Sequence, residues 1–135
     1  MKFFWTLLAI FCLFNVFALA GDWYHEIPWI DIPAHITFGI LVGIIVLRFR
    51  GYGPWPQGLL AVVLATLLAG LLWELLEFLR DHYVAIPYGF SLAQRGTADT
   101  VRDILDTIVG GFVAYSLQLR VRHPSISLRS SKTKN

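Results

Sequence analysis

The sequence predicts an all-α, polytopic membrane protein with four transmembrane helices in a bundle, or three if the first is a cleaved signal peptide. Of its 135 residues, 56% are hydrophobic and only 15% are charged. An average soluble domain has about a quarter of its residues charged, so this composition is typical of a membrane protein. Four apolar stretches also approach the roughly 20 helical residues that a bilayer requires. They cover residues 3–20, 33–47, 58–79 and 100–119.

The first apolar stretch, residues 3–20, has two interpretations. As a secretory signal peptide it has Lys2 before the apolar run and Ala-Leu-Ala at 18–20, which are small residues typical of a cleavage site. However, the run is longer than a usual signal core and only one lysine precedes it. These features favour a retained transmembrane helix. The stretch contains Cys12, the only cysteine of the chain, so no intrachain disulfide forms.

The three later stretches are expected to span the membrane whatever happens to the first. The second is the shortest, and we expect it to begin at Asp31 or to extend to Arg48. The segment at 48–57, RFRGYGPWPQ, is rich in Gly and Pro and is typical of a turn. We therefore expect one helical domain over residues 1–123, followed by a basic, disordered cytoplasmic tail over residues 124–135.

The distribution of basic residues predicts the orientation of the helices. Connections on the cytoplasmic side of a membrane protein carry an excess of Lys and Arg. In this chain, the side with more Lys and Arg residues also holds both termini. We therefore expect a multi-pass protein of the cell (inner) membrane with both termini in the cytoplasm. All nine acidic residues would then lie toward the outer side. The basic residues assigned to the inner side are Lys2, Arg48, Arg50, Arg120, Arg122, Arg129, Lys132 and Lys134.

Acidic residues recur at helical spacing at the outer ends of three stretches. An α-helix turns by about 100° per residue, so residues three or four apart point the same way and each group forms one stripe. Carboxylates within apolar helices are costly, and they usually pair, bind cations or take part in chemistry. The stripes are Asp31 with His35, then Glu74, Glu77 and Asp81, then Asp99, Asp103 and Asp106.

Facing stripes of this kind are typical of cation sites in helical bundles. Oxygen ligands favour magnesium, calcium or manganese, and an imidazole makes zinc or iron suitable as well. Such a divalent metal ion would polarise a phosphate or a carbonyl, or activate water. Without a metal, close carboxylates displace each other's pKa values, so that one of them could carry a proton. The expected metal ligands are Glu74, Glu77, Asp103, Asp106 and His35, with His35 and Glu77 as candidate catalytic residues and Asp31 and Asp99 as further members.

Capping and ion pairing offer a structural alternative for part of these stripes. Asp31 precedes Pro33 at a helix start and suits an N-cap, and Asp99 is similarly placed in the fourth stretch. Arg102 can pair with Asp99 at i,i+3 and with Asp106 at i,i+4. Two further alternatives are an ion pair of Arg80 with Glu74 or Glu77, and a hydrogen-bonded packing role for His35.

Glycines in two of the apolar stretches predict close helix packing. Gly39 and Gly43 are four residues apart in the second stretch, and Gly110 and Gly111 interrupt the fourth. Small residues let transmembrane helices approach each other where hydrophobicity cannot drive their association. We expect this close packing to bring the acidic stripes within reach of one another.

Several of these residues fall into three phrases of the sequence. The phrases are Asp31-x-x-x-His35-x-x-x-Gly39, Trp73-Glu74-x-x-Glu77 and GTADTVRDILDTIVGG at 96–111. Over residues 31–116 they resemble small bacterial inner-membrane proteins of the YjdF type, which are similar to the wider VanZ-like group. The resemblance implies a membrane helical fold, and it points to Asp31, His35, Glu74, Glu77, Asp99, Asp103 and Gly110.

The resemblance to VanZ itself is weaker at two positions. VanZ-like proteins tend to have an Asn four residues after the late Asp, where this chain has Thr107. They also tend to have a Gln shortly after the mid-chain Glu, where this chain has Glu77-Phe78. The resemblance therefore favours the YjdF-like branch and does not imply the association of VanZ with glycopeptide-antibiotic resistance.

The sequence predicts an integral membrane protein whose outward-facing acidic and histidine pocket acts on a lipid or cell-envelope component by metal-assisted chemistry. The alternative is a non-enzymatic cation- or proton-handling subunit, or a scaffold subunit. The inner halves of the stretches offer few polar residues for a path through one subunit. Membrane lipids and a homo-oligomer or another membrane protein are the expected partners. No basic segment interleaved with aromatic residues indicates nucleic-acid binding.

Overall fold

The computed structural model describes residues 2–27, 29–49 and 56–122, and it describes the side chains of the last helix as far as Gln118. The predictions for Arg50 and for the tail at 124–135 lie outside the described residues. All the regular secondary structure in the described part is helical and no strand occurs there, which confirms the all-α prediction. The elements are α1 Lys2–Ala20, α2 Trp23–Glu26, α3 Asp31–Phe49, α4 Gln57–Arg80, the π-helical turn η1 Asp81–Ala85, α5 Ile86–Tyr88 and α6 Thr97–Arg122.

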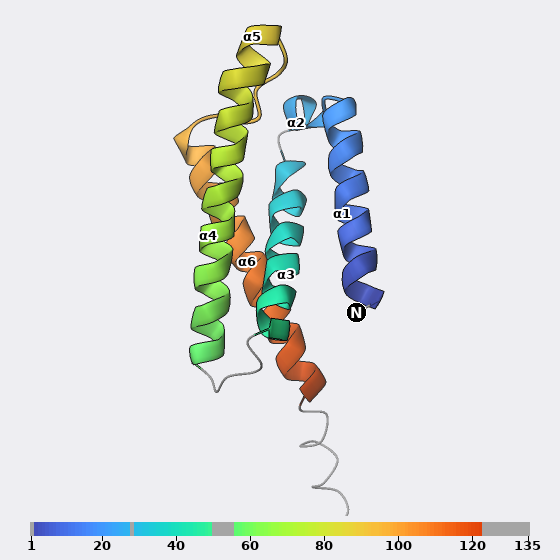
Figure 1. Cartoon of the computed structure of the whole chain (residues 1–135), viewed down its shortest axis with the longest axis vertical. Coiled ribbons are helices and arrows are strands. Elements are labelled where there is room, and N and C mark those ends of the chain that lie inside the picture. Colours follow the sequence, from blue (N-terminus) through green and yellow to red (C-terminus); the bar gives the residue numbers. More distant parts are fainter. Residues whose placement is uncertain (1, 28, 50–55, 123–135) are drawn as a thin grey trace, which may run out of the picture.

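The four long helices alternate in direction, and the short helices α2 and α5 lie at the same end of the molecule (Figure 1). The most extensive packing is between α3 and α6, followed by α4 against α6 and α3 against α4. Helix α1 packs less extensively, mainly against α3. The ends of α3, α4 and α6 that carry the acidic residues therefore lie at the same end of a three-helix core, as the sequence predicts for the acidic stripes.

Three helical segments of the described chain are long and apolar enough to cross a membrane. They are Lys2–Ala20, Asp31–Phe49 and the continuous segment Gln57–Tyr88. Helix α6, the predicted fourth span, is not among them, and its first ten residues carry Asp99, Arg102, Asp103 and Asp106. It begins at Thr97, three residues before the predicted start, so Asp99 lies in its first turn and the prediction of an N-cap at Asp99 is wrong.

Glycines bring α3 and α6 into backbone contact, which confirms the packing predicted from the sequence. A Cβ atom on Gly39 would lie 1.9 Å from the carbonyl oxygen of Thr107, and one on Gly110 would lie 2.1 Å from the carbonyl oxygen of Ile36. Real Cβ atoms do not approach backbone atoms this closely, so neither position accepts a side chain without moving a helix. This contact fixes the height of α6 relative to α3.

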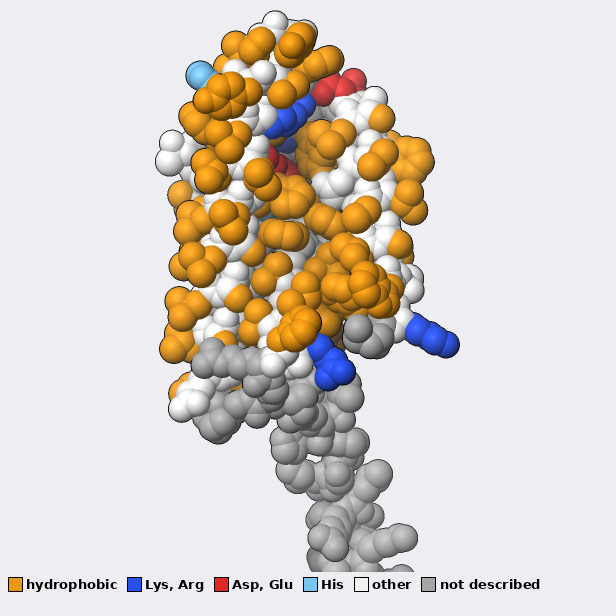
Figure 2. Space-filling model, in the orientation of Figure 1, with side chains coloured by type: hydrophobic (Ala, Val, Ile, Leu, Met, Phe, Trp, Pro, Cys, Tyr) orange, Lys and Arg blue, Asp and Glu red, His pale blue; other side chains and the backbone are white. Residues whose placement is uncertain are grey.

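Charged side chains separate between the two ends of the molecule. On the face shown in Figure 2, acidic side chains lie only near the end that carries α5, and basic side chains lie at the opposite end as well. The wide band between them is hydrophobic (Figure 2). A hydrophobic band bounded by charged ends is the surface expected of a protein that lies within a bilayer.

Candidate metal centre

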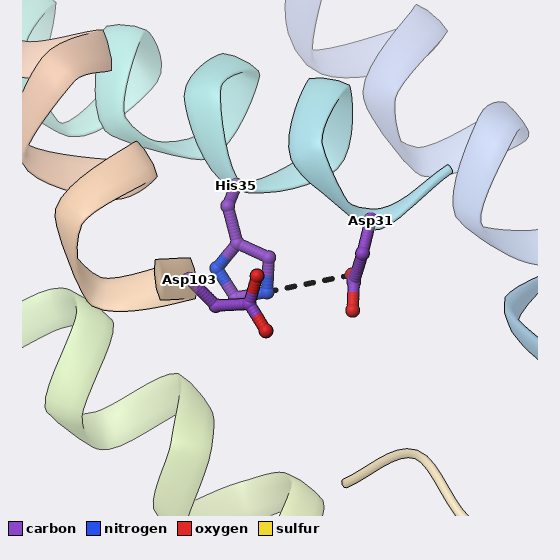
Figure 3. Close-up of side chains that lie close together, drawn as sticks. All are labelled: Asp31, His35 and Asp103. Carbon is purple, nitrogen blue, oxygen red and sulfur yellow. Dashed lines mark ion pairs between the residues drawn. The ribbon is translucent and has the colours of Figure 1, made fainter. Parts of the chain in front are cut away.

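Three buried side chains meet between α3 and α6. Asp31 and His35 come from the first two turns of α3, and Asp103 comes from α6 (Figure 3). Each offers one possible ligand atom, and these atoms all lie within 4.8 Å of one another. The exposed fractions are 3% for Asp31, 1% for His35 and 1% for Asp103. We call these three residues the α3–α6 cluster.

The sequence builds this cluster in two steps. Asp31 and His35 are one helical turn apart, so the two side chains point to the same side of α3. Gly39 continues that stripe one turn further on, and its contact with the Thr107 backbone draws α6 against α3. Asp103 is one turn before Thr107 on α6 and is therefore held opposite His35.

The two ring nitrogens of His35 have different surroundings. Nδ1 lies 3.2 Å from the hydroxyl oxygen of Thr107, and this hydroxyl donates a 2.9 Å hydrogen bond to the main-chain carbonyl of Asp103. Nε2 lies 3.4 Å from Oδ1 of Asp31 (Figure 3) and has no hydrogen-bond partner among the described residues. The carboxylate of Asp31, the first residue of α3, thus lies beside an imidazole in addition to any role at the helix start.

Arg102 forms ion pairs with all three acids of the α6 stripe. Its Nη2 atom lies 2.5 Å from Oδ1 of Asp99 and 3.0 Å from Oδ1 of Asp103, and its Nε atom lies 4.0 Å from Oδ2 of Asp106. The ion pairing predicted from the i,i+3 and i,i+4 spacing is therefore confirmed. It occupies one oxygen of Asp103 and leaves the second oxygen of that carboxylate for another ligand.

The two glutamates predicted as ligands lie apart from the α3–α6 cluster. Glu74 is buried, and its Oε2 atom accepts a 3.3 Å hydrogen bond from Nε2 of Gln94, whereas its Oε1 atom has no partner among the described residues. Glu77 accepts a 2.7 Å hydrogen bond from the indole N–H of Trp73. Of the five predicted ligands, the structure brings together His35 and Asp103, with Asp31 as the third member. Metal binding itself stays a prediction.

A cavity of about 320 Å³ adjoins the cluster. It lies between the last turns of α1, the C-terminal part of α4 and the segment 91–93, and Asp31 and Glu77 contribute to its wall. Figure 2 shows a hollow with acidic and basic side chains near the same end of the molecule. The carboxylate of Asp31 thus faces both the cluster and a space that a small group can enter.

Tyr24 of α2 forms another part of the cavity wall. Its hydroxyl donates a 2.7 Å hydrogen bond to Oδ1 of Asn15. Burial raises the pKa of the Tyr24 phenol above its usual value, and the nearby carboxylates of Asp31 and Glu77 raise the pKa further. The phenol therefore stays protonated and remains a hydrogen-bond donor in this acidic surrounding.

Asp81 and Arg80 hold the segment 89–96 over the end of α4. The buried carboxylate of Asp81 accepts hydrogen bonds from the main-chain N–H groups of Ala93 and Gln94 at 2.9–3.0 Å. Arg80 donates to Oδ1 of Asp81 at 2.8 Å and to the carbonyl of Ser91 at 3.1 Å. Arg80 therefore pairs with Asp81, and the predicted pairing with Glu74 or Glu77 is not found in the described structure.

Thr107 and Tyr24 are polar residues of the site to which the sequence analysis gave no role. Thr107 is fully buried and is hydrogen-bonded to His35. Its position four residues after Asp103 is the signal in the sequence that could have placed it on the same stripe. Tyr24 carries no comparable signal, because it lies on a four-residue helix between two longer ones.

Comparisons with known proteins agree with a membrane protein. Residues 1–124 match the model of a family described as "Predicted membrane protein (DUF2238)". No curated protein and no solved structure matches the chain. The matched family is the YjdF-like group, which confirms that part of the resemblance, whereas a relation to VanZ-like proteins stays a prediction. With almost its whole length matched, the chain belongs to the DUF2238 family of predicted membrane proteins.

Proposed function

We propose that this protein is a four-span protein of the bacterial inner membrane whose α3–α6 cluster binds a divalent metal ion. The bound metal and the adjoining cavity would act on a phosphate-bearing lipid or another cell-envelope component at the outer side of the membrane. The single observation that carries this proposal is the convergence of three buried ligand atoms within 4.8 Å. A buried imidazole nitrogen without a hydrogen-bond partner among the described residues supports it.

The proposed topology adds α6 as the fourth span and places both termini in the cytoplasm. Helix α6 lies along α3 and α4, and its acidic residues are gathered in its first ten residues. Lys2 and Arg48 lie at the opposite end from these acids, as the positive-inside rule requires. With this orientation, the cavity beside Asp31 opens near the outer interface.

The chemistry follows from the residues that surround the cavity. Asp31, His35 and Asp103 would hold the metal, which when bound would polarise a phosphate oxygen or activate water. Glu77 faces the cavity with one carboxylate oxygen bonded to Trp73, so the other oxygen is placed to accept a proton. His35 serves as a ligand in this proposal, which leaves Glu77 as the candidate base.

Elemental analysis of protein purified in mild detergent without chelators tests the metal centre. We expect near-stoichiometric metal in the wild type and in the control Asp99→Asn, which removes one acid of the same stripe outside the cluster. We expect metal to be lost in the double variant His35→Gln/Asp103→Asn. A metal-free wild type, or metal retained by a folded double variant, would refute the metal centre.

Hydrolysis of phospholipid substrates tests the catalytic part of the proposal. Glu77→Gln should keep the metal and lose turnover, because Glu77 is not one of the three residues of the cluster. Turnover that survives in a Glu77→Gln/Asp103→Asn variant would exclude this mechanism.

A non-enzymatic role in cation or proton handling, or as a scaffold, is the second candidate. The near-complete burial of His35 and Asp103 favours it, because a buried cluster gives a substrate little direct access. Such a subunit would need a second copy or another membrane protein to complete a path across the membrane. Protein that contains metal but cleaves no lipid phosphate would favour this candidate over the enzyme.

A further inference from the structure

We infer that Thr107 holds His35 in the tautomer that carries its proton on Nδ1, and that the α3–α6 cluster therefore selects a first-row transition metal over magnesium or calcium. The inference rests on the proposed metal centre and names the class of ion that it takes. Thr107 is a positioning residue here, because it acts on the metal only through His35.

The single hydroxyl proton of Thr107 determines which of its two hydrogen bonds the hydroxyl donates and which it accepts. A threonine hydroxyl has one proton to donate and two lone pairs that accept. That proton is used in the 2.9 Å bond to the main-chain carbonyl of Asp103, which is four residues earlier on α6. Toward Nδ1 of His35, at 3.2 Å, the hydroxyl oxygen can only accept. Nδ1 must then be the donor, which assigns a proton to this nitrogen.

The neutral ring consequently presents a lone pair at Nε2. This atom lies 3.4 Å from Oδ1 of Asp31 (Figure 3). In the inferred tautomer both atoms are acceptors. Two facing lone pairs repel each other in a buried site, where no water offsets the repulsion. A cation between them converts the repulsion into two coordinate bonds. His35 is 1% exposed, and Nε2 has no hydrogen-bond partner in the described part of the chain.

Backbone packing keeps Thr107 in this role. The carbonyl oxygen of Thr107 lies only 1.9 Å from the position that a Cβ atom on Gly39 would take. Gly39 is one turn after His35 on α3, so the two helices cannot slide without breaking this contact. The hydroxyl that orients the imidazole is thus fixed by a contact between backbones.

The donor set indicates the class of metal. One imidazole nitrogen and two carboxylates suit manganese, iron or zinc, whereas magnesium and calcium prefer oxygen ligands alone. A metal-binding histidine usually donates its second ring N–H to a fixed acceptor, which sets its orientation and raises its basicity. Thr107 supplies such an acceptor.

Two variants of Thr107 distinguish the effect of its hydroxyl group from the effect of its side-chain volume. Thr107→Val keeps the shape and removes the hydroxyl, and Thr107→Ser keeps the hydroxyl. Titration of metal-free full-length protein with Zn²⁺, Mn²⁺, Mg²⁺ and Ca²⁺ gives the affinities. We expect wild type and Thr107→Ser to bind Zn²⁺ and Mn²⁺ more tightly than Mg²⁺ or Ca²⁺. We expect Thr107→Val to lose about 10- to 100-fold in Zn²⁺ affinity, the usual effect of losing a partner behind a metal ligand.

Nitrogen-15 NMR of the histidine rings in the metal-free protein provides a readout that does not depend on metal binding. The His35 signals, identified by their loss in His35→Gln, should show a protonated Nδ1 and an unprotonated Nε2 in wild type and in Thr107→Ser. The opposite tautomer, an imidazolium at neutral pH, or unchanged Zn²⁺ affinity in Thr107→Val would overturn the inference.

The titration also distinguishes a failure of this inference from a failure of the proposed metal centre. Equal or tighter binding of Mg²⁺ would overturn the selectivity and leave the metal centre in place. Binding of none of the four ions would overturn both, whatever the tautomer.

Discussion

Helices α1 and α3 have similar apolarity and very different packing. The most apolar windows of α1 and α3 have mean hydropathies of 2.3 and 2.0, but 11% of the α1 window is buried against 33% of the α3 window. Helix α3 gains its contacts through Gly39 and Gly43, which allow α6 to approach, and it buries Asp31 and His35 in the same interface. Apolarity therefore identifies helices that suit a membrane, and small and polar residues decide which of them build a site.

The contacts of α1 are of another kind. The ring of Phe11 lies 6.1 Å from that of Phe38 and 5.9 Å from that of Trp73, measured between ring centres. Further along, Asn15 accepts the hydrogen bond of Tyr24. Of these residues, Asn15, Tyr24 and Trp73 line the cavity, and none of the five belongs to the α3–α6 cluster. Changes in α1 should therefore affect the protein less than changes between α3 and α6, and the following predictions test this order.

Gly110→Ala should have the largest effect. The added Cβ would meet the carbonyl oxygen of Ile36 at 2.1 Å, and a backbone atom cannot move aside as a side chain can. Overpacking of this kind costs about 1–3 kcal/mol, and we expect the upper end of that range. Thermal unfolding in detergent, followed by circular dichroism, measures the loss.

Gly70→Ala is the matched control for this prediction. Its Cβ would lie 3.4 Å from Cα of Ile104 on the same helix α6, a distance that a small adjustment accommodates. The control should unfold near the wild-type temperature. Equal stability of the two variants would show that the α3–α6 contact is no tighter than that of α4 with α6.

Arg102→Gln should change cation affinity in the opposite direction from the substitutions in the cluster. The guanidinium lies 3.0 Å from Oδ1 of Asp103 and competes with a metal for the same carboxylate. Removing one positive charge at this distance should strengthen cation binding by about tenfold, which corresponds to about 1.4 kcal/mol. Isothermal titration of the metal-free protein with Zn²⁺ measures the change. Weaker binding would mean that Arg102 positions Asp103 and does not compete with the ion.

The helical fold was accessible from sequence because it depends on local apolarity. The predicted stretches recur as α1, α3, α4 and α6, with ends that differ by a few residues. The spacing of Asp31 and His35 correctly put both on one side of α3, and the glycines correctly predicted close packing. These inferences need only the period of a helix and the size of a side chain.

The composition of the cluster was less accessible. Glu74 and Glu77 lie on a stripe as clear as that of α3, but Glu74 is hydrogen-bonded to Gln94, and Glu77 is hydrogen-bonded to Trp73 of its own helix. Helical period determines which residues share a stripe and does not determine which stripes face each other. Thr107 carries no charge, so it gave no electrostatic signal, although it lies on the same stripe as Asp103.

Phe11→Ala should have the smallest of the three effects. The substitution removes ring contacts with Phe38 and Trp73, which are worth about 1 kcal/mol together. The loss is smaller than in a water-soluble core, because lipid chains that replace the ring are as apolar as the protein. Unfolding temperature measures it, with the exposed Phe17 of the same helix, changed to Ala, as the control. Zn²⁺ affinity should stay at the wild-type value, because no residue of α1 belongs to the cluster. If Phe11→Ala weakened Zn²⁺ binding as strongly as Asp103→Asn, α1 would be part of the site and the contrast between the two regions would fail.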